Sequence, residues 1–482
     1  MGPFSFLDRT HTVAKPGFSR WLVPPAALSI HLAIGQAYAF SVFKKPLNYL
    51  IQVSTAGGGT GVLPAVDSPN PADWKFTDLG WIFILAIFFL GVSAAVFGKW
   101  LERVGPRKAM FASAVCFGSG FFISALGVQL HQLWLIYLGY GVIGGFGLGI
   151  GYISPVSTLI KWFPDRPGMA TGMAIMGFGG GALIGAPLSR NLMDYFRSDH
   201  NLGVEQTFLV MGAIYFVAMM FGVFTVRVPG EGWRPEGWTP PAKPKALVTV
   251  HNVEVNEASM TPQFWLLWIV LCTNVTAGIG ILEQASPMIR ELFRGRVSPA
   301  AAAGFVALLS LFNMGGRFIW STVSDYIGRK NTYYIFFVLG AILYYLAPRT
   351  GVSGMNSVPV FVAIVCVIVS MYGGGFATVP AYLRDLFGTM EVGAIHGRLL
   401  TAWSAAGIFG PVLVNYIREY LKNRGVALAD TYSTVLYVMV GLLVVGLIAN
   451  AFVRPVNPRH WYQPEATKPE AAPTVGLATA AQ

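Results

Sequence analysis

A single arginine lies in the middle of an apolar segment. Arg317 belongs to the run NMGGRFIWSTVSDYIGRK at residues 313–330, where Phe318 and Trp320 flank it. A charged side chain at the centre of a membrane span costs about 2.5–3.5 kcal/mol on insertion scales, so an ionisable residue there indicates a functional site. A guanidinium offers a planar fork of donors that matches a carboxylate. The pattern predicts anion binding by Arg317, with Asn313 one turn earlier to orient the guanidinium or donate to the anion. The alternative is a structural arginine paired with carbonyls or an acid.

Two short loops repeat one pattern of an acid, a glycine and bases. The first reads ERVGPRK from residue 102 and the second reads DYIGRK from residue 325. We expect the acids to pair with bases or a helix N-terminus in one state of the protein and to release them in another. Alternatively, the loops only fix the membrane topology through their bases. The residues assigned to this gating motif are Glu102, Arg103, Gly105, Arg107, Asp325, Gly328 and Arg329.

The composition is that of a membrane protein. The 482 residues are 54% hydrophobic and 11% charged, with a mean hydropathy of +0.57, whereas soluble domains carry about 25% charged residues. The net charge of +11 does not indicate nucleic acid binding, because the bases lie between apolar runs, where the positive-inside rule places them. The three cysteines lie in apolar runs and have no spacing typical of a disulfide framework or a metal site.

The apolar runs predict an all-α integral membrane protein with twelve transmembrane helices in two pseudo-symmetric six-helix bundles. A spanning helix needs about 20 apolar residues. We expect a segment at 1–20, a first bundle at 21–228, a Pro-rich linker at 229–262, a second bundle at 263–454 and a disordered tail at 455–482. The expected spans are Trp21–Phe43, Thr77–Phe97, Ala109–Leu130, Leu133–Leu159, Gly168–Arg190, Thr207–Val226, Gln263–Ile289, Pro299–Val323, Thr332–Pro348, Val358–Tyr382, Leu399–Tyr420 and Tyr432–Val453.

The distribution of Lys and Arg over the loops orients the chain. With both termini in the cytoplasm, more bases fall inside than outside. We therefore expect a multi-pass protein of the cell inner (cytoplasmic) membrane. Duplicated halves fit a transporter whose repeats rock about a site at the middle of the membrane.

At this point the sequence resembles the major facilitator superfamily over nearly its whole length. Within that superfamily it is similar to the oxalate/formate antiporter family, which is related to the monocarboxylate transporters. The stretches that carry the resemblance are GQAYAFSVF from residue 35, GIGYISP from 149, KWFPDR from 161, MGFGGGA from 176 and NMGGR from 313.

The resemblance implies that the arginine of the eighth span, Arg317, holds a substrate carboxylate. Oxalate carriers of this family have a second cation, a lysine in the eleventh span, and the matching position here is Trp403. One fixed cation suits a monoanion, because a second buried carboxylate would lack a partner. We therefore favour lactate, pyruvate, formate or similar monocarboxylates over oxalate. Trp403 would cap the apolar end of such a substrate, or it is only a packing aromatic.

Further candidates line the spans that form the cavity in this superfamily. Gln36, Tyr38, Tyr152 and Tyr372 are the expected lining residues, although each alone is more often interfacial or core. Glu283 and His31 are candidates to carry a coupled proton. The alternative for Glu283 is an ion pair near the outer surface, and the alternative for His31 is helix packing.

The leading hypothesis is a secondary carrier of small carboxylates, by proton symport or by anion exchange of the oxalate/formate type. A membrane sensor on the same scaffold is the second class. We do not expect an enzyme, because the sequence shows no nucleophile–base set, metal cluster, Walker loop or dinucleotide turn. We expect no cofactor and no nucleic acid partner, only a small organic anion, protons and the lipid bilayer around a monomer.

Overall fold

The computed structural model describes residues 5–56, 70–239, 247–294, 296–351 and 355–463. Part of the stretch between the first two expected spans, the middle of the linker and the end of the C-terminal tail lie outside these ranges. The domain boundaries expected at residues 20, 228, 262 and 454 remain predictions.

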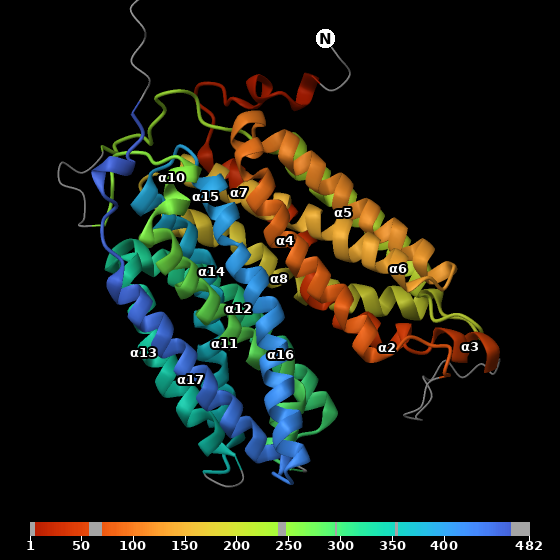
Figure 1. The fold of residues 1–482 in the computed structure, drawn as a ribbon. Coiled ribbons are helices and arrows are strands. Elements are labelled where there is room, and N and C mark those ends of the chain that lie inside the picture. The colour runs from red at the N-terminus through yellow and green to blue at the C-terminus, as the bar shows by residue number, and fades with distance from the viewer. Residues whose placement is uncertain (1–4, 57–69, 240–246, 295, 352–354, 464–482) are drawn as a thin grey trace, which may run out of the picture.

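The chain folds into two groups of long helices that lie side by side (Figure 1). The first group comprises α1 Val23–Ile34, α2 Ser41–Leu47, α3 Leu50–Ala56, α4 Phe76–Val104, α5 Pro106–Gln129, α6 Leu133–Ile136, α7 Gly145–Trp162, α8 Pro167–Phe196 and α9 Val204–Thr225, with a π-helix at Tyr137–Gly144 between α6 and α7. After the short α10 Val255–Met260, the second group comprises α11 Pro262–Leu292, α12 Pro299–Ile327, α13 Arg329–Leu346, α14 Val358–Phe387, α15 Val392–Leu399, α16 Thr401–Asn423 and α17 Leu428–Phe452.

The prediction of membrane-spanning helices is confirmed. Within the described ranges, eleven helices are long and apolar enough to cross a membrane, and one bent pair of helices raises the number to twelve. The bent pair is the first span, which turns by 44° where Arg20–Ala39 meets Ser41–Leu47. It was expected to be one span, Trp21–Phe43. The eleventh span also differs from expectation, because it begins earlier, with α15, and breaks at Leu400.

The 3-10 segment that precedes the bend in the first span begins in close packing against α8. The helix changes to 3-10 geometry at Gly35–Ala39. A Cβ atom placed on Gly35 would lie 2.4 Å from the Phe178 carbonyl oxygen. Only glycine permits the two backbones to approach so closely, which is how small residues act between membrane helices.

The local sequence explains where two helices of the second bundle begin. The Thr261 hydroxyl accepts a hydrogen bond from the Phe264 amide at 3.3 Å, and the Ser298 hydroxyl accepts one from the Ala301 amide at 3.1 Å. In each case a proline follows at the first helical position, where its missing N–H is not needed.

Glycines also bring the two bundles together. A Cβ atom on Gly172 of α8 would lie 2.1 Å from the Ser321 hydroxyl of α12, and one on Gly98 of α4 would lie 2.7 Å from the Ala394 Cα of α15. Both contacts lie toward the end of the molecule where α4 and α12 terminate in the duplicated loops. We call this end the motif end and the opposite one the far end.

Candidate functional site

Arg317 is placed deep between the bundles by α12. It lies ten residues before the last residue of that helix, which is about 15 Å at a rise of 1.5 Å per residue. The side chain is fully buried, and Nε donates to the Asn313 Oδ1 at 3.1 Å. Among the described residues, Nη1 and Nη2 have no hydrogen-bond partner. Asn313 thus orients the guanidinium and leaves its two terminal nitrogens available.

Aromatic rings enclose the guanidinium. Arg317 Cζ lies 5.1 Å from the ring centroid of Phe376 and 5.7 Å from that of Phe178. Trp403 packs on both rings, at 4.5 Å from Phe376 and 5.3 Å from Phe178. The faces of such rings attract a cation, but they offer no full negative charge. The positive charge therefore has apolar walls and no carboxylate among the contacts described.

Two tyrosines join the bundles beside this enclosure. The hydroxyls of Tyr38, from the first span, and Tyr372, from α14, lie 3.2 Å apart and share a hydrogen bond. The Tyr38 ring contacts Phe178 and Trp403 at centroid distances of 5.1 and 6.4 Å. A Cβ atom on Gly373, next to Tyr372, would lie 2.3 Å from the Asn313 carbonyl oxygen, so the pair lies beside the Asn313–Arg317 turn of α12.

Two further hydrogen-bond donors lie in the aromatic enclosure around Arg317. The Tyr152 ring, from α7, lies 5.3 Å from the Trp403 ring. The Tyr152 hydroxyl and Trp403 Nε1 are buried and have no hydrogen-bond partner in the described part of the chain. A small site with a guanidinium fork, two further donors and aromatic walls has the composition of a site for one anionic head with an apolar body.

The structure brings six of the seven predicted substrate-binding residues together: Arg317, Asn313, Tyr38, Tyr152, Tyr372 and Trp403. Gln36 is placed differently. It is fully buried and accepts a hydrogen bond from Tyr140 at 2.8 Å within the first bundle. Its partner lies in the π-helix, an irregularity that often marks functional positions.

Of the two candidate proton carriers, the structure describes the side chain of His31 but not that of Glu283. Glu283 lies in α11, and its side chain falls outside the described part of the structure. His31 lies fully buried in α1, with Nδ1 against the Ala174 carbonyl oxygen and Nε2 at 3.1 Å from the Tyr152 carbonyl oxygen. It therefore adjoins the site through Tyr152.

The acid of the first loop bridges the two bundles. Glu102 Oε1 accepts hydrogen bonds from the Ser157 hydroxyl at 2.9 Å and from the Gly393 amide, at the start of α15, at 3.0 Å. Glu102 Oε2 pairs with Lys161 at 2.6 Å. An anion at a helix N-terminus is stabilised by the free N–H groups and the helix dipole, so Glu102 fastens the second bundle to the first.

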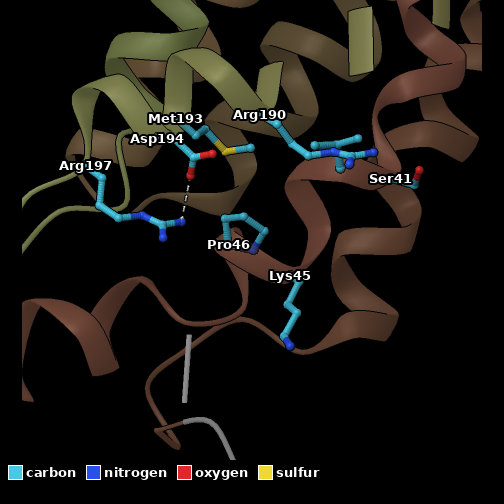
Figure 2. Close-up of a pocket in the computed structure, with 8 residues that line it drawn as sticks. Ser41, Lys45, Pro46, Arg190, Met193, Asp194 and Arg197 are labelled. Carbon is cyan, nitrogen blue, oxygen red and sulfur yellow. Dashed lines mark ion pairs between the residues drawn. The ribbon is translucent and has the colours of Figure 1, made fainter. Parts of the chain in front are cut away.

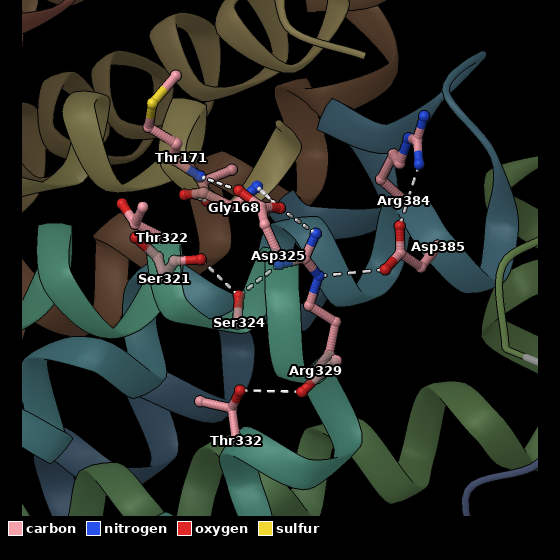
Figure 3. Close-up of polar contacts among 12 residues, drawn as sticks. Gly168, Thr171, Ser321, Thr322, Ser324, Asp325, Arg329, Thr332, Arg384 and Asp385 are labelled. Carbon is pink, nitrogen blue, oxygen red and sulfur yellow. Dashed lines mark hydrogen bonds and ion pairs between the residues drawn. The ribbon is translucent and has the colours of Figure 1, made fainter. Parts of the chain in front are cut away.

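The acid of the second loop makes the reciprocal contact (Figure 3). Asp325 accepts hydrogen bonds from the Gly168 and Met169 amides, both at 2.9 Å, at the start of α8 in the first bundle. It also pairs with Arg329 at 2.6 Å, and Arg329 Nε contacts Asp385 at 3.1 Å. Each bundle therefore caps one helix of the other bundle at the motif end.

The remaining motif residues have distinct positions. Gly105 and Gly328 have φ values of +87° and +88°, which side chains rarely adopt. Arg107 is buried and donates to the Phe6 carbonyl oxygen at 2.8 Å, whereas Arg103 is exposed. The structure thus separates the glycines and acids, which shape the bundle contact, from these two bases.

A pocket of about 360 Å³ opens at the far end of the first bundle (Figure 2). Lys45, Arg190 and Arg197 line it together with Asp194, which pairs with Arg197 at 3.5 Å. Its lining carries a net positive charge and lies apart from the Arg317 enclosure.

Several site residues were not predicted from the sequence. Phe178 and Phe376 hold the guanidinium between their rings, and both lie within or beside the glycine runs of α8 and α14. The sequence signal that could have identified them is an aromatic residue inside or directly beside a run of glycines. Outside this set, His396 is 1% exposed and packs on Tyr152 at a ring distance of 5.8 Å.

The sequence matches one superfamily over most of its length. A sequence model described as the Major Facilitator Superfamily matches residues 47–411 and, in a second match, residues 297–480. The chain is 29% identical over 314 residues to the oxalate:formate antiporter of Oxalobacter formigenes, covering 65% of this chain and 69% of that protein. It is 26% identical over 394 residues to YhjX of Escherichia coli strain K12, an uncharacterized MFS-type transporter, covering 81% and 86% of the two chains.

A third relative and a solved structure extend the comparison. The chain is 22% identical over 443 residues to apicoplast pyruvate carrier 1 of Toxoplasma gondii, covering 81% of this chain and 79% of that protein. The solved structure of the proton:xylose symporter XylE superposes with a TM-score of 0.64 at 13% identity, covering 90% of this chain and 96% of that one. This structural likeness confirms the fold, and the relatives confirm the resemblance seen in the sequence.

Proposed function

The chain belongs to the major facilitator superfamily, and from that premise we propose that it is a secondary active transporter of small carboxylates, with monocarboxylates such as lactate, pyruvate or formate favoured. The observation that carries the proposal is the buried Arg317 guanidinium, whose Nη1 and Nη2 lack hydrogen-bond partners among the described residues. A desolvated charge of this kind needs an anion, and a carboxylate matches its fork.

The number of cations near the site favours a monoanion. Residues 401–410 of α16 include no lysine or arginine, and Trp403 faces the enclosure with its ring. The second carboxylate of oxalate would be buried there at the cost of an unpaired charge. The aromatic walls instead suit the apolar body of a monocarboxylate, as the relationship to a pyruvate carrier also supports.

The duplicated loops supply the gate of an alternating-access cycle. In this proposal the motif end is cytoplasmic, both termini are cytoplasmic, and the protein lies in the cell inner membrane as a monomer. Glu102 and Asp325 hold the cytoplasmic side closed by capping α15 and α8. Release of both caps lets the bundles rock apart and opens the Arg317 site to the cytoplasm.

Proton symport is the favoured mode, and exchange of two anions is the second candidate. The relative named as an oxalate:formate antiporter favours exchange. Both modes use Arg317, and they differ in whether the carrier returns without an anion.

The test is uptake of labelled pyruvate and labelled oxalate into liposomes containing the purified protein, with and without an inward proton gradient. Symport of a monocarboxylate predicts pyruvate accumulation driven by the gradient and little oxalate uptake. Oxalate entry that needs a preloaded anion and ignores the gradient would establish exchange instead. Uptake of neither compound, in liposomes where the protein is correctly inserted, would overturn the proposal.

A further inference from the structure

His31 connects three helices of the first bundle at a point close to Arg317. It extends from α1, its Nδ1 contacts the Ala174 carbonyl oxygen of α8, and its Nε2 contacts the Tyr152 carbonyl oxygen of α7 at 3.1 Å. Its ring also packs on the Tyr152 ring at 5.2 Å. The side chain is fully buried, so neither nitrogen exchanges its partner for water in this conformation.

The two contacts do not suit a neutral imidazole. A carbonyl oxygen only accepts hydrogen bonds, and a neutral imidazole has one N–H donor and one bare nitrogen. One of the two contacts of His31 therefore sets a lone pair against a lone pair when the ring is neutral. An imidazolium has two N–H donors and satisfies both carbonyl oxygens. The hydrogen-bond geometry therefore suits the protonated ring, whereas burial and the nearby Arg317 charge oppose it.

The surrounding charges determine when that proton is stable. The groups that act on His31 are the Arg317 charge and the backbone carbonyls of Ala174 and Tyr152, and His31 in turn acts on His396. In the described part of the chain, no carboxylate is among these groups. Two cations near one another are unstable in a dry site unless an anion compensates them. A carboxylate bound at Arg317 is such an anion.

Asn313, the polar partner of Arg317, cannot bind the proton. Asn313 binds the Arg317 Nε, but an amide side chain does not titrate. The proton of a symport cycle therefore needs another group near the anion, and His31 is the titratable group whose geometry already provides acceptors for both of its N–H bonds.

We propose that His31 is the proton-binding site of the carrier, taking up one proton when a carboxylate binds at Arg317. This inference rests on the proposed function. In a conformation that is open at the far end, the bare ring nitrogen accepts a proton from water, and the new N–H bond donates to the second carbonyl oxygen. When the substrate leaves on the motif side, the Arg317 charge is no longer compensated, and the proton returns to water there.

The test measures proton uptake when the purified protein binds pyruvate. The protein is placed in weakly buffered detergent solution with a pH-sensitive dye, and fully ionised pyruvate of the same pH is added. The wild-type protein is expected to take up about one proton per bound pyruvate. His31→Gln is expected to bind pyruvate with less than a fifth of that proton uptake, and to retain exchange of labelled for unlabelled pyruvate in liposomes.

His396→Gln is the matched control, because His396 is a second buried histidine that packs on Tyr152. It is expected to keep the proton uptake of the wild type. Unchanged uptake in His31→Gln, or loss of uptake in His396→Gln alone, would overturn the assignment. Failure of the wild-type protein to bind pyruvate would instead count against the proposed function.

A measurement on the wild-type protein covers the case in which His31→Gln does not fold. Nitrogen NMR of protein labelled at histidine distinguishes an imidazolium from a neutral ring. A buried imidazolium signal that appears with pyruvate and persists in His396→Gln supports the proposal. Histidines that all stay neutral when pyruvate is bound contradict it.

Discussion

Helices α4 and α12 are two copies of one element that have diverged where the chemistry lies. Both are 29 residues long, both end in the acid–glycine loop, and their acids Glu102 and Asp325 lie at the same position from the helix end. At the position of Arg317, however, α4 carries Ala94. The proposed gate is thus duplicated, while the charge that would bind an anion belongs to one bundle alone.

The packing around Ala94 explains why α4 holds no second arginine there. A Cβ atom on Gly397 of α15 would lie 2.1 Å from the Ala94 carbonyl oxygen, so the helices are in backbone contact. Around Arg317, Gly179 instead leaves space for the side chain, since a Cβ atom on it would lie 2.9 Å from Arg317 Nε. At the level of Ala94 and Arg317, glycine permits backbone contact in the first helix pair and admits a guanidinium in the second.

The largest expected effect comes from Arg317→Lys. Lysine keeps the charge but loses the fork, and loss of charge-assisted hydrogen bonds of about 1.5–3 kcal/mol predicts a 10–100-fold lower kcat/KM for pyruvate uptake. Uptake into liposomes measures it, with Arg103→Lys as the control because Arg103 is exposed. Wild-type uptake by Arg317→Lys would show that the unduplicated arginine does not bind the substrate.

The two acids should differ when each is neutralised. Arg329, the partner of Asp325, has a side chain that is only 6% exposed, whereas Lys161, the partner of Glu102, is 30% exposed and can return to water. Arg329 keeps Asp385 as a second partner, but Asp325 accepts two amide hydrogen bonds from α8 whereas Glu102 accepts one from α15, and hydrogen bonds to a charged group contribute about 1.5–3 kcal/mol each. Asp325→Asn is therefore expected to open the motif end more than Glu102→Gln does.

Labelling of a buried cysteine measures that opening. Ser321→Cys is introduced in a background without the three native cysteines, since Ser321 is fully buried under the gate. A membrane-impermeant thiol reagent is applied from the motif side. Asp325→Asn should raise the labelling rate by more than Glu102→Gln does. Equal rates would mean that the two copies of the gate contribute alike.

Trp403→Lys tests whether one cation sets the preference for a monoanion. A second cation in the enclosure should improve oxalate binding by about tenfold, the effect of 1.4 kcal/mol, and weaken pyruvate binding. Calorimetric titration of both anions checks this, and Trp403→Phe is the control that alters the wall without adding charge. If oxalate binds equally to both variants, the number of cations does not decide the selectivity.

The smallest effect is expected from substitution of Gly105 and Gly328, which occupy the same position in the two loops. Gly105 and Gly328 have positive φ with extended ψ, a conformation that costs other residues about 1–3 kcal/mol. A Cβ atom on Gly328 meets nothing within 4 Å, whereas one on Gly105 lies 3.3 Å from the Arg9 Cβ. Both alanine variants should lower the thermal unfolding temperature, and Gly105→Ala should lower it further. An unchanged temperature in both would refute the backbone argument.

Much of this arrangement could be predicted from the sequence because it depends on local patterns. Apolar runs of spanning length gave the helices, and Arg317 was recognisable as a charge within such a run. The bend after Ala39 and the break at Leu400 could not be predicted, because they depend on contacts between helices distant in the chain.

The contacts that the predicted residues make were harder to predict than the residues themselves. Glu102 and Asp325 are predicted from the sequence as gate acids, but the amides of Gly393 and Gly168 that they bind carry no side-chain signal. Likewise, Phe178 and Phe376 read as ordinary apolar residues until the fold placed them on either side of Arg317. Gln36 read as a cavity residue, but its hydrogen bond is to Tyr140.

The central claim is that the guanidinium of Arg317 holds one carboxylate, and pyruvate binding to purified Arg317→Gln tests it most directly. Isothermal titration calorimetry should show one pyruvate per wild-type protein and no measurable binding to a folded Arg317→Gln variant that retains the wild-type unfolding temperature. Pyruvate binding of equal affinity in the two proteins would contradict the claim and place the carboxylate elsewhere.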